Sequence, residues 1–374
     1  MTDLPTLDVT KLRGVPVLLR SSLNVPTEGG VVTNTYRLQE SVKTIELLAK
    51  AGARVVVMGH LGRSPTESLQ PVFAALSSMT ALPLSFASDV GGPDSVEKAA
   101  ALKDGEVLLI ENVRREAREE ANDPELARRL AALAEVYVND AFPDSHRAHA
   151  SIVGVPALLP HYAGPNFIKE HEGIAPAFTP TSPSLAIIGG AKFETKEPVL
   201  KFLLEKYDRV FVGGALANDF LAARGHEVGV SLVSREYDLS RYLTHPKLML
   251  PTDVVVDGPR GVTRRAASAV EKDERVLDVG PESLAALAPL VAAAKCIVWN
   301  GPMGNFENGF KEGTLSVARM IADSAAHSVI GGGDTLAAIE ESALHGNFSH
   351  VSTAGGAMLQ FIADGTLPGI EALR

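Results

Sequence analysis

Cysteine is nearly absent from this sequence of 374 residues, since Cys296 is the only one. A single cysteine excludes an intrachain disulfide and a zinc site built on cysteine ligands. Long hydrophobic runs are missing as well: no stretch of about 18 apolar residues occurs, so we expect no membrane span. The first residues, MTDLPTLDVTK, lack the apolar core of a signal peptide. Together these absences predict a cytoplasmic protein.

Positively charged residues are fewer than negatively charged ones. The chain has 35 lysines and arginines and 45 aspartates and glutamates, which gives a net charge of −10. This balance argues against nucleic acid or an anionic membrane as a partner of the whole protein, but it leaves room for a local basic pocket. The hydrophobic share of 45% and the charged share of 21% are typical of a globular chain. The chain is longer than a single compact hydrophobic core usually accommodates, so two domains are expected.

Short apolar runs alternate with helical patterns along the chain, which favours parallel α/β sheets. A helical pattern over 38–52, for example, separates the first two expected strands. The expected strands are 15–20, 53–60, 105–112 and 136–140 in the first half, and 184–190, 208–214, 295–301, 327–333 and 350–356 in the second.

Basic side chains follow the strands of the first half. In open parallel sheets, ligands bind beyond the carboxyl ends of the strands, so side chains from these ends should converge on one site. At any one position, an ordinary surface arginine explains the residue as well as a binding role does. Basic residues at four successive strand ends, however, predict a site for a small anion. The residues are Arg20 and Asn24, His60 and Arg63, Arg114, and then His146, Arg147 and His149.

Glycine clusters follow the strands of the second half: GGAK (189–192), GGAL (213–216), GPMG (301–304), GGGDT (331–335) and AGGA (354–357). Glycine lets the backbone approach a ligand closely. GGGDT leads into a helical pattern, so its N–H groups and the helix dipole should face a phosphate. Neither GxxxxGK[ST] nor GxGxxG occurs, which excludes the usual P-loop and dinucleotide motifs. We therefore expect a nucleotide crevice of another kind.

One half thus collects an anion and the other holds a nucleotide, a division that suits phosphoryl transfer. Closure of a cleft would exclude the water that otherwise hydrolyses the donor. Lys192 and Lys196 stand four residues apart at an expected helix start, where the dipole opposes positive charge. That position favours a phosphate-binding role for the two lysines.

From about residue 15 to the C-terminus the sequence resembles the phosphoglycerate kinase family, motif after motif and in order. The matching runs are LNVP, the region of Arg37, HLGR (60–63), LLIENVR (108–114), YVNDAF (137–142), HRAHAS (146–151), GGAK, DVGP (278–281), VWNGPMG (298–304), FE (306–307), GGGDT, HVST (350–353) and LPGIEAL (367–373).

The resemblance implies transfer of a phosphoryl group between 1,3-bisphosphoglycerate and ADP, with Mg²⁺, giving 3-phosphoglycerate and ATP. It implies an α/β fold of two Rossmann-like domains with parallel sheets, joined by a hinge helix around a bilobal cleft. The expected divisions are 1–163 for the phosphoglycerate-binding domain, 164–183 for the connecting helix and linker, 184–358 for the nucleotide-binding domain, and 359–374 for a segment that packs back on the first domain. A monomer is expected.

The resemblance also implies the roles of individual residues. Catalysis would fall to Arg37, Lys192 and Gly333, and Asp334 would hold Mg²⁺. The acid substrate would be bound by Ser22, Asn24, Arg37, His60, Arg63, Arg114 and Arg147. The nucleotide would be bound by Lys192, Lys196, Gly214, Asn300, Glu307, Gly332, Gly333, Asp334 and Thr335.

The sequence departs from the family pattern at Ser22, where the family has an aspartate that contacts the glycerate hydroxyl. Asp144 adds a carboxylate in the turn before His146, and we hypothesise that it compensates for Ser22; a plain capping role for Asp144 is the alternative. Smaller departures are Asn305, Ala354 and Gln360. Two other functions remain open at this point: a kinase of the same fold that acts on a different small acid, and a nucleotide-binding relic without catalysis.

Overall fold

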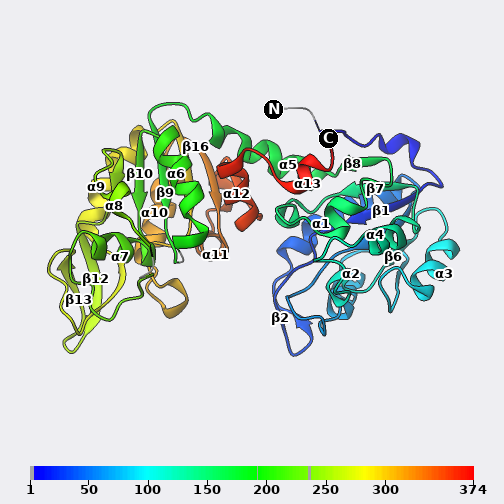
Figure 1. Ribbon diagram of the computed structural model, residues 1–374, viewed down its shortest axis with the longest axis horizontal. Coiled ribbons are helices and arrows are strands. Elements are labelled where there is room, and N and C mark those ends of the chain that lie inside the picture. Colours follow the sequence, from blue (N-terminus) through cyan, green and yellow to red (C-terminus); the bar gives the residue numbers. More distant parts are fainter. Residues whose placement is uncertain (1–3, 192, 235–236) are drawn as a thin grey trace. The chain divides into compact units, whose positions relative to one another are not determined.

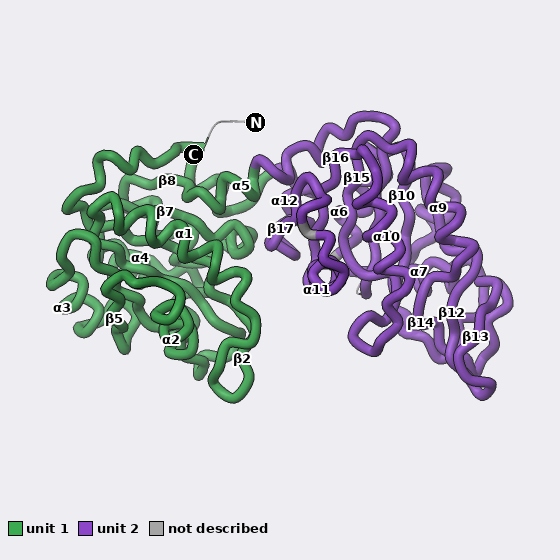
Figure 2. The backbone as a smooth tube through the Cα atoms, turned by 180° about the vertical axis from the view of Figure 1, so that it is seen from behind, with its two compact units in different colours: residues 1–171, 366–374 green, residues 172–365 purple. Residues whose placement is uncertain are grey.

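The computed structural model describes residues 4–191, 193–234 and 237–374. The chain divides into two compact units (Figures 1 and 2), and each is described by itself. Unit 1 comprises Met1–His171 and Thr366–Arg374, and unit 2 comprises Glu172–Gly365. The last residues of the chain therefore belong with its first half.

Unit 1 is built on a parallel sheet of six strands in the order β5-β6-β4-β1-β7-β8. Its strands are β1 (Pro16–Arg20), β4 (Arg54–Met58), β5 (Leu84–Phe86), β6 (Val107–Leu109), β7 (Val136–Asn139) and β8 (His161–Ala163). Its helices are α1 (Tyr36–Lys50), α2 (Gln70–Met79), α3 (Pro93–Ala101), α4 (Pro124–Ala131), α5 (Pro165–Ile174) and the C-terminal α13 (Pro368–Glu371). Strands β2 (Thr27–Glu28) and β3 (Val31–Val32) form a small hairpin.

Unit 2 is built on a second parallel sheet of six strands, in the order β11-β10-β9-β15-β16-β17. Its strands are β9 (Ser184–Ile188), β10 (Arg209–Val212), β11 (Leu248–Met249), β15 (Cys296–Asn300), β16 (His327–Gly331) and β17 (His350–Ser352). Its helices are α6 (Glu197–Lys206), α7 (Gly214–Ala223), α8 (Ser240–Leu243), α9 (Pro281–Ala293), α10 (Glu312–Ala322), α11 (Gly333–Glu341) and α12 (Gly356–Asp364).

The expected α/β fold with two parallel sheets is confirmed, and every expected strand is present with its ends shortened. The central strands are nearly continuous runs of valine, leucine and isoleucine, because helices cover both faces of a parallel sheet. Strand β9 is buried along its whole length, and strand β1 is buried at all but its first residue. Each sheet accordingly lies at the centre of its own hydrophobic core.

An antiparallel sheet in unit 2 was not expected from the sequence. It joins β12 (Asp253–Gly258), β13 (Gly261–Ala266) and β14 (Arg275–Val279) in the order β13-β12-β14. The outer strand β13 has no buried residue, so it alternates between exposed and partly buried positions instead of forming an apolar run. Helices α7 and α10 contact β14, which brings this sheet against the end of the parallel one.

The C-terminal segment returns to unit 1 beside the loop that carries HRAH. Helix α13 packs against the helical turn η4 (Ala150–Gly154), and the backbone N–H of Gly369 donates to the carbonyl of Ser145 at 2.8 Å. The loop of residues 142–149 is therefore fixed by a segment more than two hundred residues further along the chain.

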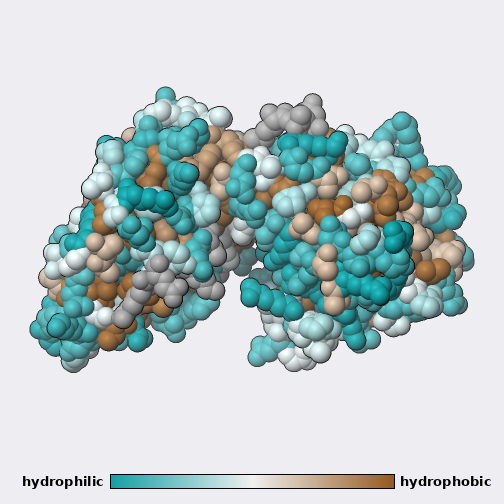
Figure 3. All heavy atoms as spheres, in the orientation of Figure 1, coloured by the Kyte–Doolittle hydropathy of each residue, from teal (hydrophilic) through white to brown (hydrophobic). Residues whose placement is uncertain are grey.

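The surface of each unit mixes hydrophilic residues with small hydrophobic patches (Figure 3). The most exposed large apolar side chains are scattered, and two of them, Val230 and Leu232, lie in one loop of unit 2. Within the described ranges, no helix combines the length and the apolar character needed to cross a bilayer.

Asp140 ties three elements of unit 1 together. It follows β7 and is buried, and its two carboxylate oxygens accept the backbone N–H of Asn166 at 2.8 Å and the side-chain amide of Asn166 at 2.7 Å. The same amide also donates to the carbonyl of Glu40 in α1 at 3.0 Å. Burial raises the pKa of Asp140 to about 6, although hydrogen bonds from Thr44 and Asn166 oppose the rise.

This raised pKa makes the stability of unit 1 depend on pH. Folding favours the protonated form of Asp140, so its contribution is fully present below the unfolded pKa of about 3.9 and is lost as the pH rises through about 6. We expect the difference in unfolding free energy between the wild type and Asp140→Asn to shift by up to about 3 kcal/mol between pH 4 and pH 7, to the disadvantage of the wild type. Urea unfolding at both pH values measures it, and a difference independent of pH would contradict the assignment.

Candidate active site

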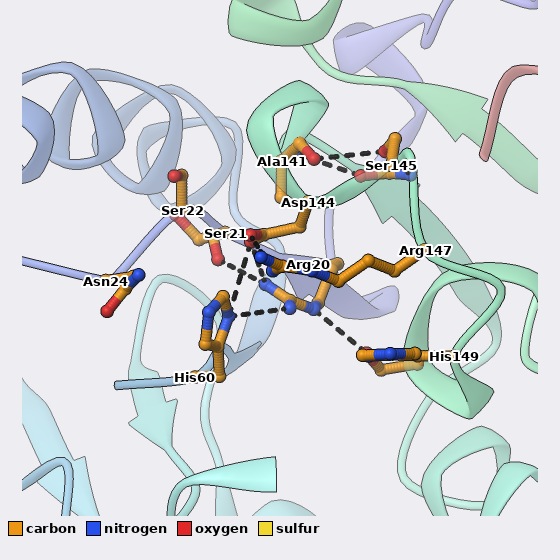
Figure 4. Close-up of polar contacts among 12 residues, drawn as sticks. Arg20, Ser21, Ser22, Asn24, His60, Ala141, Asp144, Ser145, Arg147 and His149 are labelled. Carbon is orange, nitrogen blue, oxygen red and sulfur yellow. Dashed lines mark hydrogen bonds and ion pairs between the residues drawn. The ribbon is translucent and has the colours of Figure 1, made fainter. Parts of the chain in front are cut away.

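The basic residues of unit 1 gather at the carboxyl end of β1 (Figure 4). Arg20, the last residue of β1, is buried, and each nitrogen of its guanidinium has a partner. Nε donates to the hydroxyl of Ser151 at 3.0 Å, and Nη1 donates to the carbonyl of Ser21 at 2.7 Å and to Oδ2 of Asp144 at 3.1 Å. Nη2 lies 3.2 Å from Nδ1 of His60. Arg20 is therefore a buried hub rather than a free ligand for an anion.

Asp144 is the carboxylate at the centre of this cluster. Burial alone would raise its pKa, but the charges of His60, Arg20 and Arg147 hold the pKa far below its usual range, so the group is ionised. The pKa of His60 is lowered, chiefly by burial. Burial and the nearby charge of Arg147 also lower the pKa of Arg114. The cluster therefore carries a surplus of positive charge that suits a multiply charged anion.

A second set of contacts arranges the loops beside Arg20. The side-chain oxygen of Asn24 accepts the N–H of Gly62 at 2.9 Å, and Nη1 of Arg37 donates to the carbonyl of Asn24 at 2.9 Å. Arg114 donates to the carbonyl of Gly62. Arg63 follows directly and is exposed. The sheet thus brings Asn24, His60 and Arg114 together from three different strand ends, as the sequence predicts.

Several buried polar atoms around Arg20 have no hydrogen-bond partner among the described residues. They are the hydroxyls of Ser21 and Ser22, Nε2 of His60 and Nδ1 of His146. Ser21 is completely buried and His60 is 1% exposed. A buried polar atom without a partner is costly, so a group of them marks a place where a polar ligand completes the hydrogen bonding.

Unit 2 contains a pocket of about 1000 Å³ beyond the ends of its parallel strands. Its walls join the glycine clusters to the antiparallel sheet, which the sequence did not reveal as part of the site. The apolar side is lined by Leu232, Val254, Val276, Leu277, Met303 and Phe306, and the polar residues Asn218, Asp278, Glu307 and Asp334 also line it. The combination of a broad apolar wall and a few polar groups is typical of a cofactor or nucleotide site.

At the rim of this pocket, two glycines allow backbone segments from different strand ends to approach one another closely. A Cβ at Gly301, whose φ is +93°, would lie 2.4 Å from the carbonyl oxygen of Gly189. A Cβ at Gly214, whose φ is +61°, would lie 2.6 Å from the backbone N of Gly190. Both the conformation and the space therefore require glycine, which keeps the backbone of three strand ends within reach of one ligand.

The loop GGGDT leads into a helix, as the sequence predicts. Gly332 has φ +107° and precedes α11, which begins at Gly333 and carries Asp334 in its first turn. Thr335 is buried, and its hydroxyl accepts the N–H of Gly301 at 3.0 Å. The N–H groups in the first turn of α11 have no acceptor within the helix, so they make an anion-binding position with a favourable dipole.

Lys196 is the buried cation of unit 2. It donates to the carbonyl of Gly189, and burial lowers its pKa to about 8, although the charge of Asp334 opposes this shift. Asn300 ends β15 and its side-chain nitrogen lacks a partner in the described part of the chain. Lys192, the other lysine of the expected pair, lies outside the described residues.

The pocket fits Mg²⁺ only as a nucleotide complex. No group of three or more histidines, cysteines or carboxylates capable of holding a metal occurs within the described residues. Asp334 alone lines the pocket next to the start of α11. Mg²⁺ is commonly held by one or two carboxylates together with substrate phosphates, so one aspartate here suffices.

Comparisons with known proteins agree with this geometry. The profile of the family described as phosphoglycerate kinase matches residues 7–365. The phosphoglycerate kinase of Methylorubrum populi is 42% identical over 397 residues, covering 100% of this chain and 99% of the relative, and that of Moorella thermoacetica is 43% identical over 388 residues, covering 98% of each. Among solved structures, phosphoglycerate kinase from Coxiella burnetii is similar with a TM-score of 0.84, 38% identity and 99% coverage of both chains. The enzyme from Pyrococcus horikoshii is similar with a TM-score of 0.86 and 31% identity, covering 97% of this chain and 96% of that one.

The crossing of Gly301 and Gly189 can be tested with a matched pair of substitutions. Gly301 and Gly309 have similar φ values, +93° and +88°, but a Cβ at Gly309 would meet nothing within 4 Å. Gly309→Ala should cost about 1–2 kcal/mol for its left-handed conformation alone. Gly301→Ala should destabilise unit 2 by more and weaken ATP binding at least about tenfold, or 1.4 kcal/mol, because the rim backbone must move. Thermal unfolding and calorimetric titration with ATP measure this, and equal effects of the two variants would refute the close approach.

Proposed function

The chain belongs to the phosphoglycerate kinase family, and from this premise we propose how its residues divide the reaction between the two units. The activity is reversible phosphoryl transfer between 1,3-bisphosphoglycerate and ADP, a reaction of glycolysis, with ATP and 3-phosphoglycerate on the other side. The match along both units, each with its own site for an anionic ligand, carries this assignment. The alternatives of a different acid substrate or a non-catalytic relic are not favoured.

The acid substrate binds at the basic cluster of unit 1. His60, Arg63, Arg114 and Arg147 supply hydrogen-bond donors and positive charge for its phosphate and carboxylate, and Ser22 and Asn24 lie beside them. The partnerless donors around Arg20 support this placement. Arg37 lies nearest to the transferred group, where it neutralises charge spread over the equatorial oxygens.

The nucleotide binds in the pocket of unit 2. The base lies on the apolar wall, Glu307 takes the ribose hydroxyls, and Gly214 and Asn300 lie beside the phosphates. The phosphates lie at the start of α11, on Gly332, Gly333 and Thr335, with Lys196 close by. Asp334 holds Mg²⁺, which neutralises the developing charge on the phosphate oxygens when it is bound with the nucleotide.

Phosphoryl transfer needs positioning and charge more than covalent chemistry. Lys192 follows the phosphoryl group between the two substrates, while Arg37 and the N–H of Gly333 stabilise it in flight. Because the acid and the nucleotide bind to different units, the units must close during the reaction, with residues 164–183 as the connecting hinge. The 1–163 and 184–358 segments then act as the two binding domains, and residues 359–374 link them a second time.

We further propose a monomer in the cytoplasm, where a glycolytic enzyme meets its substrates. The net charge of −10 disfavours nucleic acid as a partner, and both proposed ligands are small anions received by local concentrations of positive charge.

The activity is tested by coupled assay of the purified protein with ATP, Mg²⁺ and 3-phosphoglycerate. We expect turnover by the wild type and a loss of about 10²–10³ in kcat for Lys192→Ala, because a positive charge on the transferred group stabilises the transition state. Binding of ATP should remain measurable. Lys201→Ala is the matched control, since Lys201 is an exposed residue of α6. No turnover by the wild type would refute the function, and near-normal kcat of the Lys192 variant would refute the role of that lysine.

The metal assignment has its own test. Asp334→Asn keeps the size of the side chain but removes its charge, so the affinity for ATP in the presence of Mg²⁺ should fall about tenfold, or 1.4 kcal/mol. The affinity for ATP in EDTA should stay the same or rise, because a negative charge near the phosphates is gone. Asp364→Asn, an exchange of the last residue of α12, serves as the control. An unchanged Mg²⁺ titration would exclude Asp334 as a ligand.

A further inference from the structure

Asp144 occupies an unusual place for a carboxylate, the middle of a cationic site. It ends the helical turn η3 (Phe142–Asp144), and its side chain is 6% exposed. Oδ2 accepts from Arg20 at 3.1 Å and lies 3.5 Å from Nδ1 of His60, while Oδ1 lies 3.4 Å from Nη1 of Arg147. Both oxygens are thus engaged by protein groups. The geometry gives Asp144 an indirect role, unlike the direct acceptor that a simple exchange with Ser22 would make it.

The contacts of His60 show which of its two ring nitrogens is available to bind a ligand. Arg20 can only donate hydrogen bonds, so its contact of 3.2 Å with Nδ1 favours the neutral ring with its proton on Nε2, whereas the Asp144 carboxylate, 3.5 Å from the same Nδ1, favours the charged ring. In the charged ring Nε2 carries a proton as well. Nε2 is buried and has no partner among the described residues. Figure 4 shows the ring with one edge turned to Arg20 and Asp144. The other edge therefore presents an N–H donor that no residue described in the structure satisfies.

We propose that Asp144 is a positioning residue for the acid substrate: it holds Arg20, and through Arg20 the ring of His60, so that Nε2–H of His60 donates to an oxygen of a small phosphorylated carboxylic acid. This inference rests on the proposed function and deepens it. The carboxylate of this site is thus that of Asp144, on the loop before His146, and position 22 after the end of β1 carries a serine instead.

The charges explain why a carboxylate is needed there. Arg20, Arg114 and Arg147 lie close enough for their charges to influence one another. Without Asp144, Arg20 would be a buried guanidinium whose nearest acid is Glu119, reached only through the hydroxyl of Ser151. Such a guanidinium would turn toward the incoming anion and release His60. The Asp144 carboxylate prevents this by pairing Arg20 inside the protein.

Glu119 offers a matched control for the test. It is as buried as Asp144 and belongs to the same network, but its hydrogen bonds go to Ser151, and within the described residues no hydrogen bond or ion pair joins it to His60. Burial raises the pKa of Glu119, and glutamine keeps the size of its side chain. Glu119→Gln should therefore leave Arg20 and His60 in place, whereas Asp144→Asn removes the charge that holds them.

The experiment compares the wild type, Asp144→Asn and Glu119→Gln by calorimetric titration with 3-phosphoglycerate and with ATP. We expect Asp144→Asn to weaken 3-phosphoglycerate binding about ten- to a hundredfold, through the loss of a well-placed hydrogen bond, and to leave ATP binding unchanged. The ¹⁵N NMR signals of the His60 ring should report a proton on Nε2 in the wild type and in Glu119→Gln, and should shift in Asp144→Asn. Thermal unfolding and ATP affinity confirm that each variant is folded.

Two results would overturn the proposal: Asp144→Asn binds 3-phosphoglycerate as the wild type does, or both variants weaken binding equally with no change at His60. A wild type that binds no 3-phosphoglycerate at all would refute the proposed function instead. A further variant, Ser22→Asp, tests whether positions 22 and 144 serve the same site, because it restores a carboxylate after the end of β1. In the Asp144→Asn background it should recover part of the lost affinity; strictly additive effects would mean that the two positions serve no common site.

Discussion

The basic cluster of unit 1 depends on one buried contact, the ion pair of 3.1 Å between Arg20 and Asp144. A buried charge without a partner is expensive, and a buried pair is tolerated when further hydrogen bonds satisfy both groups. Here Ser21, Ser151 and His60 contact Arg20, and Arg147 contacts Asp144. Because Arg20 is satisfied within the protein, the charge that remains available to a ligand comes from other groups, such as Arg114 and Arg147 around it. Arg20 and Asp144 therefore have a structural role in the site, and the ligand is left to groups such as Arg114 and Arg147.

The pocket of unit 2 depends on a different constraint, the close approach of backbone segments to one another. Parallel strands β9, β15 and β16 end side by side, and glycines at these ends let their loops cross without side chains between them. Donor N–H groups at the start of α11 then lie beside an apolar wall that the antiparallel sheet provides. Under the proposed function, unit 1 binds its anion through side chains and unit 2 through backbone, because the acid must be recognised and the nucleotide phosphates must be held without blocking transfer.

The longer parallel strands could be predicted from the sequence because they are apolar runs followed by glycine or polar residues. The outer strands β5, β8 and β11 were not predicted, since each is only two or three residues long. The antiparallel sheet could not be found in this way, since β13 has no buried residue and alternates weakly; the turn at Gly258 and Gly261 was the available signal for a hairpin. Asp144 could be recognised as an added carboxylate, but its partner Arg20 is 124 residues away. Only the fold shows that the two meet, and that Asp144 is engaged by protein groups rather than open to a ligand.

The most direct test of this account is a crystal structure of the complex with 3-phosphoglycerate. We predict that Nε2 of His60 lies at about 2.7–3.2 Å from an oxygen of the acid, with the pair between Arg20 and Asp144 intact. The hydroxyls of Ser21 and Ser22 should gain partners from the ligand or from ordered water. A complex in which Asp144 leaves Arg20 to bind the substrate, or in which the acid makes no contact with His60, would contradict the account.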